Sequence, residues 1–244
     1  MGISRGNITT NIIKKGLVFN MDAANRASTI PSSTTSIAFN TVNTAISGAF
    51  NSDAQYDSST ISPSFAFDGV DDYILTNDAS SLFTNKFTMS FWWNITDTST
   101  SNTGRYICAS RNYYTVGEDG NFSYRVDPPN SIIFQSYDGR SSGQFVQSTG
   151  LSLQSNTWMN TVLTSDGTTA GKHYINGSIH EVGSRNTLSR NLSDISNGIL
   201  FGDVINFATT DDDFKIGPIH FYNRALSASE VLFNYNGLKS RLGL

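Results

Sequence analysis

The sequence predicts an all-β domain, a two-sheet antiparallel sandwich with one short C-terminal helix. Short runs in which every second residue is apolar recur along most of the chain, and turn pairs such as Asp-Gly and Asn-Gly stand between them. Helical spacing is confined to the C-terminal stretch. A length of 244 residues suits a single large β-sandwich.

The strands follow from this alternation. The clearest is 87–94, where one face collects Phe87, Met89, Phe91 and Trp93. Asn176-Gly177 lies inside 173–180 and supplies the two positive φ angles of a type I′ turn, so this segment is expected to form a hairpin. Further strands are expected at 17–22, 65–67, 73–76, 105–109, 121–126, 131–135, 144–147, 158–164, 199–202 and 214–222.

The predicted helix begins at Ser227, because Ser227 and Glu230 have the spacing of a capping box. Its apolar stripe is expected to dock on the sandwich and consists of Val231, Leu232, Tyr235 and Leu238. Cationic side chains favour the C-terminal end of a helix, where Lys239 and Arg241 lie, and Gly243 is a suitable stop.

The chain is expected to form one domain, residues 16–244, after a polar N-terminal arm, residues 1–15. Within the domain, residues 25–63 are rich in Ser and Thr and sparse in apolar residues. This composition favours a long connection that holds one or two short strands.

Charge and composition exclude several classes of partner. The net charge is −4 and there is no basic stripe, which argues against nucleic acid and against an anionic membrane surface. No apolar run is long enough to insert in a membrane or to act as a signal peptide. We therefore expect a protein that stays inside the cell or leaves it by another route, such as a virus particle. Cys108, the single cysteine, lies in an apolar run and is expected to be buried.

Four sets of residues, in this order, resemble the laminin-G-like jelly rolls of the concanavalin A-like superfamily. They are FDGVDDYI (67–74), FTMSFWW (87–93), WMNTVLTSD (158–166) with YING (174–177), and IGPI (216–219) with FYNRALS (221–227). The resemblance spans residues 16–240 and implies a jelly-roll sandwich that binds or builds rather than catalyses.

The two ends of the chain resemble domains of tailed-bacteriophage structural proteins, through GLVFNMDAAN (16–25) and the run from Asn223 to Leu244. This resemblance implies a non-enzymatic structural protein of a tailed-phage virion, such as a head decoration, a neck or tail appendage, or a fibre component. Its partners would be other virion proteins, and a homo-oligomer is one assembly that this implies. The sequence departs from the family in residues 30–60. A stand-alone lectin-like module is the alternative function, and a glucanase is a third, disfavoured one.

Catalysis is not expected, because the usual residue patterns are absent. A retaining glycosidase needs two carboxylates close together, whereas the three glutamates, Glu118, Glu181 and Glu230, are widely separated in the sequence. The histidines have no nucleophile motif beside them and are expected to lie on a hairpin surface or in a strand; they are His173, His180 and His220.

No cofactor is required, although the resemblance to laminin-G and pentraxin domains implies calcium as the one to consider. Its place in those relatives corresponds here to Gly202-Asp203 and the acidic run 211–213, which offer hard oxygen ligands. The alternative interpretation, which we favour, is a solvated acidic loop.

A glycan site needs aromatic platforms. Trp92 is the first candidate, because alternation points it away from the apolar face of its strand, and three tyrosines on expected loops are the others: Tyr113, Tyr114 and Tyr137. Host cell-surface polysaccharide is the partner that such a site implies. The alternative for all four side chains is packing against the second sheet, the long connection or a neighbouring subunit.

Overall fold

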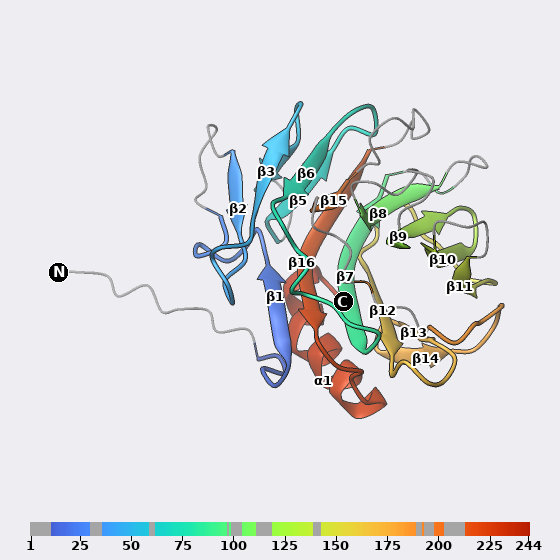
Figure 1. Cartoon of the computed structure of the whole chain (residues 1–244). Coiled ribbons are helices and arrows are strands. Elements are labelled where there is room, and N and C mark those ends of the chain that lie inside the picture. The colour runs from blue at the N-terminus through green and yellow to red at the C-terminus, as the bar shows by residue number, and fades with distance from the viewer. Residues whose placement is uncertain are drawn as a thin grey trace.

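Two antiparallel sheets packed face to face, with one helix on the outside, make up the computed structural model (Figure 1). The structure describes residues 11–29, 36–58, 62–96, 98, 104–110, 119–138, 143–188, 192, 198–202 and 213–244. In the described part, no helix is long and apolar enough to cross a membrane.

Sheet A has the strand order β14-β13-β12-β7-β16-β5-β4, and β1 pairs with β16 on the same side as β5. The long strands β7 and β16 therefore form its centre. The bounds are β1 (Leu17–Met21), β4 (Gln55–Asp57), β5 (Ser64–Phe67), β7 (Phe87–Ile95), β12 (Met159–Ser165), β13 (Lys172–Ile175), β14 (Ser178–His180) and β16 (Phe214–Tyr222).

Sheet B has the order β11-β10-β9-β8-β15-β6-β3-β2. Consecutive strands such as β5 and β6 lie in different sheets, which is the connectivity of a jelly-roll sandwich. The bounds are β2 (Ile37–Phe39), β3 (Ser47–Asn51), β6 (Tyr73–Thr76), β8 (Arg105–Ser110), β9 (Asp119–Asp127), β10 (Ser131–Asp138), β11 (Gln144–Ser148) and β15 (Ile199–Phe201).

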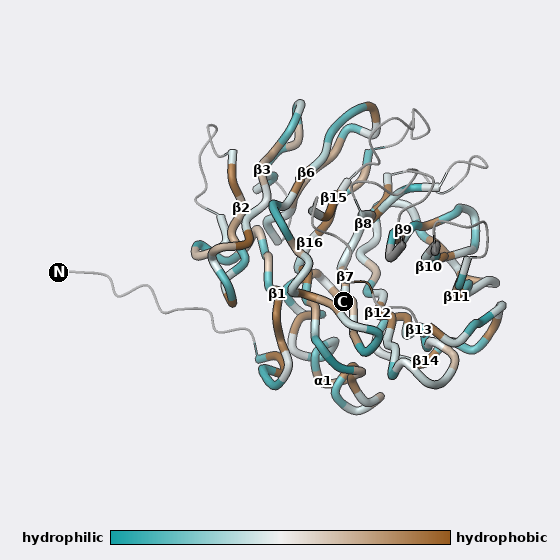
Figure 2. The backbone as a smooth tube through the Cα atoms, in the orientation of Figure 1, coloured by the Kyte–Doolittle hydropathy of each residue, from teal (hydrophilic) through white to brown (hydrophobic). Residues whose placement is uncertain are grey.

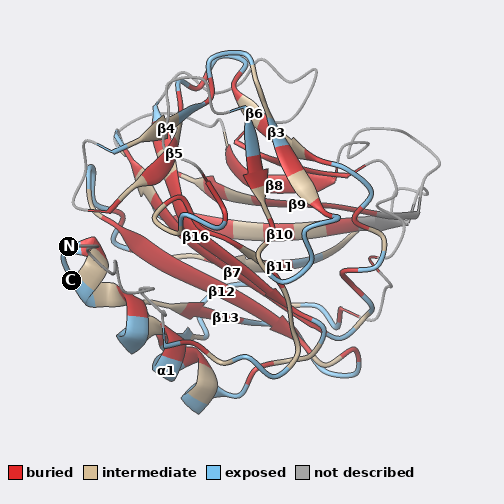
Figure 3. Ribbon diagram, turned by 90° about the vertical axis from the view of Figure 1, so that its left-hand side faces the viewer, coloured by how far each residue is buried: buried red, intermediate tan, exposed pale blue. Residues whose placement is uncertain are grey.

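The core lies between the sheets and is rich in aromatic rings. Phe91 of sheet A stacks on Tyr124 of sheet B with ring centroids 5.3 Å apart, so the two inner faces interlock. Hydrophobic stretches recur along the strands, and hydrophilic ones are common in the connections (Figure 2). Strands β7, β12 and β16 are buried along nearly their whole length, because the helix covers part of their outer face (Figure 3).

The predicted hairpin and helix are confirmed. Asn176 and Gly177 have φ angles of 49° and 80° between β13 and β14. Helix α1 (Ala228–Leu238) starts with both hydrogen bonds of the Ser227–Glu230 capping box and continues into a 3-10 helix, η1 (Lys239–Leu242), which ends at Gly243 in the left-handed region.

One position of the predicted helical stripe is wrong. Leu232 is 45% exposed, whereas Asn234 is buried. The Asn234 amide occupies the docked face because it satisfies two polar groups there: its oxygen accepts from the Ile13 N–H, and its nitrogen donates to the Tyr222 hydroxyl. Hydrophobic spacing alone cannot reveal such a buried polar junction.

Two connections are more integrated than predicted. Residues 11–15 of the expected arm pack on the domain, with Ile12 buried beside Leu238. Residues 25–63 hold three strands, β2, β3 and β4, where one or two were expected. Ala38 and Ile46 from this segment are core residues, which gives these polar strands an apolar anchor. Residues 1–10 of the arm and residues 30–35 and 59–61 of the connection lie outside the described part.

Candidate functional site

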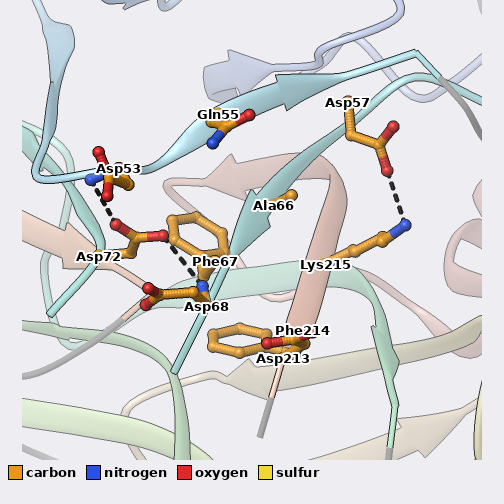
Figure 4. Close-up of a pocket in the computed structure, with 10 residues that line it drawn as sticks. All are labelled: Asp53, Gln55, Asp57, Ala66, Phe67, Asp68, Asp72, Asp213, Phe214 and Lys215. Atoms are coloured by element: carbon orange, nitrogen blue, oxygen red, sulfur yellow. Dashed lines mark hydrogen bonds and ion pairs between the residues drawn. The ribbon is translucent and has the colours of Figure 1, made fainter. Parts of the chain in front are cut away.

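A pocket of about 330 Å³ opens where β5 ends and β16 begins. The register of the sheet builds one wall, because Gln55 of β4, Ala66 of β5 and Lys215 of β16 are neighbours across three strands. Figure 4 shows the lining residues: Asp53, Gln55, Asp57, Ala66, Phe67, Asp68, Asp72, Asp213, Phe214 and Lys215.

Two core rings lie beside the pocket. Phe67 and Phe214 are direct partners in the β5–β16 pairing, and their rings stack with centroids 5.1 Å apart (Figure 4). Both side chains are buried in the main core, 3% and 1% exposed, so they support the pocket and present little ring surface to a ligand. The pocket is therefore mainly polar, and the core behind it holds its lining in place.

Asp72 fixes the acidic rim of the pocket. One of its carboxylate oxygens accepts the Asp53 N–H at 2.6 Å and the other accepts the Asp68 N–H at 2.9 Å. The side chain is buried, and this burial raises the pKa of Asp72; the nearby Asp68 and Asp53 carboxylates add to the rise, while the two N–H bonds oppose it. Asp72 thereby ties the loop before β4 to the Asp-Gly turn after β5.

Other carboxylates of the rim are available to a ligand. Asp53, Asp68 and Asp213 are exposed. Among the described residues, the carboxylates of Asp53 and Asp213 make no hydrogen bond, and one oxygen of Asp68 accepts the Val70 N–H at 2.8 Å. An ionised carboxylate only accepts hydrogen bonds, so this rim suits a ligand rich in donors.

Calcium has a possible set of ligands here. Oxygen atoms of Asp68, Asp71 and Asp72 lie within 4.8 Å of one another, and carboxylate oxygens are ligands that Ca²⁺ prefers. The family resemblance implies residues 202–203 and 211–213 as the place to consider for calcium, with a solvated acidic loop as the favoured interpretation. Asp203, Asp211 and Asp212 lie outside the described residues, while Asp213 lines this same pocket and Gly202 packs against Phe67 and the Asp72 carbonyl. Asp213, the described residue of the acidic run, thus lies on the same pocket as the acidic turn.

The structure corrects the interpretation of Trp92. Its side chain is 0% exposed and stacks on Tyr235 of α1 at 5.5 Å, with an angle of 8° between the rings. The same cluster includes Ile12, Trp158, Leu238 and Leu242. Because the docked helix covers the outer face of β7, Trp92 presents no platform to solvent. It has a packing role, as the alternative expected, but its partner is α1 and not the second sheet, the long connection or a neighbouring subunit.

The three predicted tyrosines remain predictions. Tyr113 and Tyr114 lie outside the described residues. Tyr137 lies in β10, and its side chain is likewise outside the described part.

The histidines do not form a catalytic site in the described structure. His173 was expected near a hairpin surface but is buried, and its Nδ1 lies 2.8 Å from the Ser148 hydroxyl. His220 is buried as well. Neither ring hydrogen-bonds a carboxylate within the described ranges, so the third member of a Ser-His-acid triad is missing there.

The two glutamates that the structure describes do not form a catalytic pair. Glu230 binds Arg224 and the Ser227 N–H, and the Arg224 bonds chiefly lower the pKa of Glu230 to about 2. Glu181 is exposed beside β14, the strand at the opposite edge of sheet A from β4. Glu118 lies outside the described residues.

Comparison with known families decides the relationship. The family model described as the concanavalin A-like lectin/glucanases superfamily matches residues 68–232. The chain belongs to this superfamily. The resemblance inferred from the four sequence segments is therefore confirmed, and the pocket lies at a strand end of a concanavalin A-like sandwich. A comparison with curated proteins finds no match.

Solved structures share the fold of this concanavalin A-like domain. The binding domain of botulinum neurotoxin serotype D superposes with a TM-score of 0.68 at 15% identity, covering 91% of this chain and 51% of that one. The binding domain of Paraclostridial Mosquitocidal Protein 1 gives 0.67 at 17% identity, covering 91% and 52%. The serotype D ligand-binding domain in complex with N-acetylneuraminic acid gives 0.66 at 14%, covering 91% and 51%. The chain spans about half the length of these proteins.

Sequence reasoning missed most of the pocket. It identified the Asp-Gly turn at Asp68 and the acidic run that ends at Asp213, but not Gln55, Asp57 or Lys215 as site residues. Those three come together through the pairing of β4, β5 and β16, which joins segments far apart in the chain. A single polar residue in a short strand gives no signal of this neighbourhood.

Proposed function

We propose that this chain is a carbohydrate-binding, lectin-like module that recognises its ligand without transforming it. The observation that carries the proposal is the pocket, whose lining is rich in carboxylate and amide side chains and is supported by the core behind it. Its volume of about 330 Å³ lies within the range of small-molecule sites. A sugar presents many hydroxyl donors, and the carboxylate and amide oxygens of this lining can accept them.

The comparisons support a glycan ligand at a coarse level. The family is one of lectins and glucanases, and one solved neighbour was obtained with N-acetylneuraminic acid. That sugar is the ligand of the neighbour, of which this chain matches half. The choice of sugar for this chain therefore rests on its own pocket.

Binding is favoured over hydrolysis by the state of Asp72. A retaining glycosidase uses two carboxyl groups about 5–5.5 Å apart, one of them with a raised pKa. Asp72 has a raised pKa and lies close to Asp68 and Asp71. However, it is 3% exposed and both its oxygens accept backbone N–H groups, so it is not placed to protonate a glycosidic oxygen.

Glycan-array screening of the purified chain, with and without calcium, tests this function. Ala66 lies in the middle of the pocket wall, so Ala66→Trp fills the pocket without removing a charge. Ala49, on an exposed position of β3, gives the matched control Ala49→Trp. We expect the first variant to lose binding and the second to keep it. Absence of binding to any glycan would refute the function, as would reducing-sugar release by the pure protein.

A virion location is a second, compatible proposal, supported by the resemblance of 16–25 and 223–244 to tailed-phage structural domains. In that setting the partners would be other virion proteins, and the glycan would be host cell-surface polysaccharide. Mass spectrometry of purified particles tests the location. Absence of the chain from such particles would refute it and would leave the glycan-binding proposal unaffected.

A further inference from the structure

The pocket has a strongly one-sided charge. Its described lining holds five carboxyl groups, from Asp53, Asp57, Asp68, Asp72 and Asp213, and one ammonium, from Lys215. The Lys215 ammonium already lies 2.6 Å from a carboxylate oxygen of Asp57 (Figure 4). A ligand entering the pocket therefore meets no uncompensated cation in that lining, and the negative field of the rim is left in excess.

The excess negative charge lies where a ligand would meet it, on the exposed rim of the pocket. Asp53 and Asp213 come from segments far apart in the sequence and lie on the same rim. Both residues are exposed, and their carboxylates make no hydrogen bond in the described structure. The Phe67 and Phe214 side chains beside them belong to the apolar core. Charges beside an apolar wall interact more strongly than charges in open water.

We propose that the pocket selects glycans by charge: it prefers sugars with a protonated amino group, accepts uncharged sugars, and excludes sialylated ones. This inference rests on the proposed function and names its ligand class. A sugar ammonium would donate hydrogen bonds to the rim carboxylates, and hydroxyl groups would donate to the same carboxylates more weakly. The carboxylate of a sialic acid would face the like charges of Asp53, Asp68 and Asp213.

Two matched pairs of ligands test this selection by isothermal titration calorimetry at pH 6. The first pair is the trimer of glucosamine and the trimer of N-acetylglucosamine, which differ in the amine alone. The second is lactose and 3′-sialyllactose. We expect the glucosamine trimer to bind about tenfold more tightly than its acetylated partner, a gap that narrows at high salt. Sialyllactose is expected to bind more weakly than lactose.

Variants locate the effect. Asp213→Asn removes one free charge from the rim, and we expect it to reduce the preference for the amine while the N-acetylglucosamine trimer still binds. Glu181→Gln removes the same charge from an exposed position at the far edge of sheet A and should change neither affinity. Putrescine, an amine without a sugar ring, should bind more weakly than the glucosamine trimer, because it has no hydroxyl groups to donate to the lining of the pocket.

The outcomes separate this inference from the proposed function. If no glycan binds, the proposed function itself is refuted. If glycans bind but sialyllactose binds as tightly as lactose, selection by charge is wrong and glycan binding stands. The titrations are repeated with EDTA and with calcium chloride, and tight binding of sialyllactose that requires calcium would also overturn the selection, because a cation would then bridge the two negative groups.

Discussion

Among single residues, Asp72 contributes most to the shape of the candidate site. Its two carboxylate oxygens hold the N–H groups of Asp53 and Asp68, which belong to different segments. We predict that Asp72→Ala lowers the free energy of unfolding by about 1–3 kcal/mol for each N–H left unpaired. Urea denaturation measures this loss. The neighbouring exposed Asp71→Ala should change stability by less than about 0.5 kcal/mol, and an equal loss in both variants would contradict the structural role of Asp72.

Trp92 also acts at the residue scale, through packing. It is fully buried, stacks on Tyr235 and belongs to the same apolar cluster as Trp158. We predict that Trp92→Ala lowers the free energy of unfolding by about 3–5 kcal/mol, as truncation of large buried side chains does. Trp92→Phe keeps an aromatic ring there and should bind glycans like the unmodified chain. A well-folded Trp92→Phe protein that has lost glycan binding would return Trp92 to the binding site and argue against the pocket.

At the scale of elements, the start of α1 is stabilised by several reciprocal bonds. The Ser227 hydroxyl accepts from the Glu230 N–H, and the Glu230 carboxylate accepts from the Ser227 N–H and pairs with Arg224 at 2.6 Å. We predict that Ser227→Ala costs about 0.5–2 kcal/mol of stability. Asn236→Ala, at an exposed helix position, should be neutral or slightly stabilising. Thermal unfolding of both variants provides the comparison, and a neutral Ser227→Ala would contradict the cap.

Elements also show how far the sequence could lead. Strands such as 73–76 and the Asn176-Gly177 hairpin were predictable, because alternation and turn chemistry are local. For Trp92, packing was among the alternatives, but its partner α1 was not predictable, since it depends on where the helix docks. The pocket required the register of β4 against β5 and of β5 against β16, a non-local property that Gln55 and Lys215 do not disclose in the sequence.

In the whole molecule, the docking of α1 and η1 on sheet A joins the two ends of the described chain to the sandwich. Arg241 of η1 makes two hydrogen bonds to the Asp22 carboxylate at the end of β1, and Asn234 of α1 holds Ile13. These contacts hold one outer face of sheet A closed, whereas the pocket at β4, β5 and β16 stays open. The aromatic cluster around Trp92 stabilises the fold because α1 covers it. The acidic rim is accessible to a ligand because it lies at the pocket, outside the region that the helix covers.

Two buried histidines make the stability of the whole fold depend on pH. Burial lowers the pKa of His173 to about 3, helped by the charges of Arg185 and His180. Burial also lowers the pKa of His220 to about 3, helped by Arg241 and Lys14. In the unfolded chain a histidine has a pKa of about 6.5. Between these values the unfolded state binds more protons, so stability is retained above pH 6.5 and falls as the pH falls toward 3.

This linkage gives a measurable slope. Two histidines that are protonated in the unfolded state alone change the free energy of unfolding by at most about 2.7 kcal/mol per pH unit. We predict that the urea concentration at the midpoint of unfolding decreases when the pH is lowered from 7 to 5. The loss of stability that follows protonation of Glu230, whose pKa is lowered to about 2, occurs below pH 4.5, outside this window. Asp72, whose pKa is raised, contributes with the opposite sign to the histidines. The double variant His173→Asn and His220→Gln removes both titrating groups and should flatten the slope. An unchanged slope in that variant would show that other groups take up the protons.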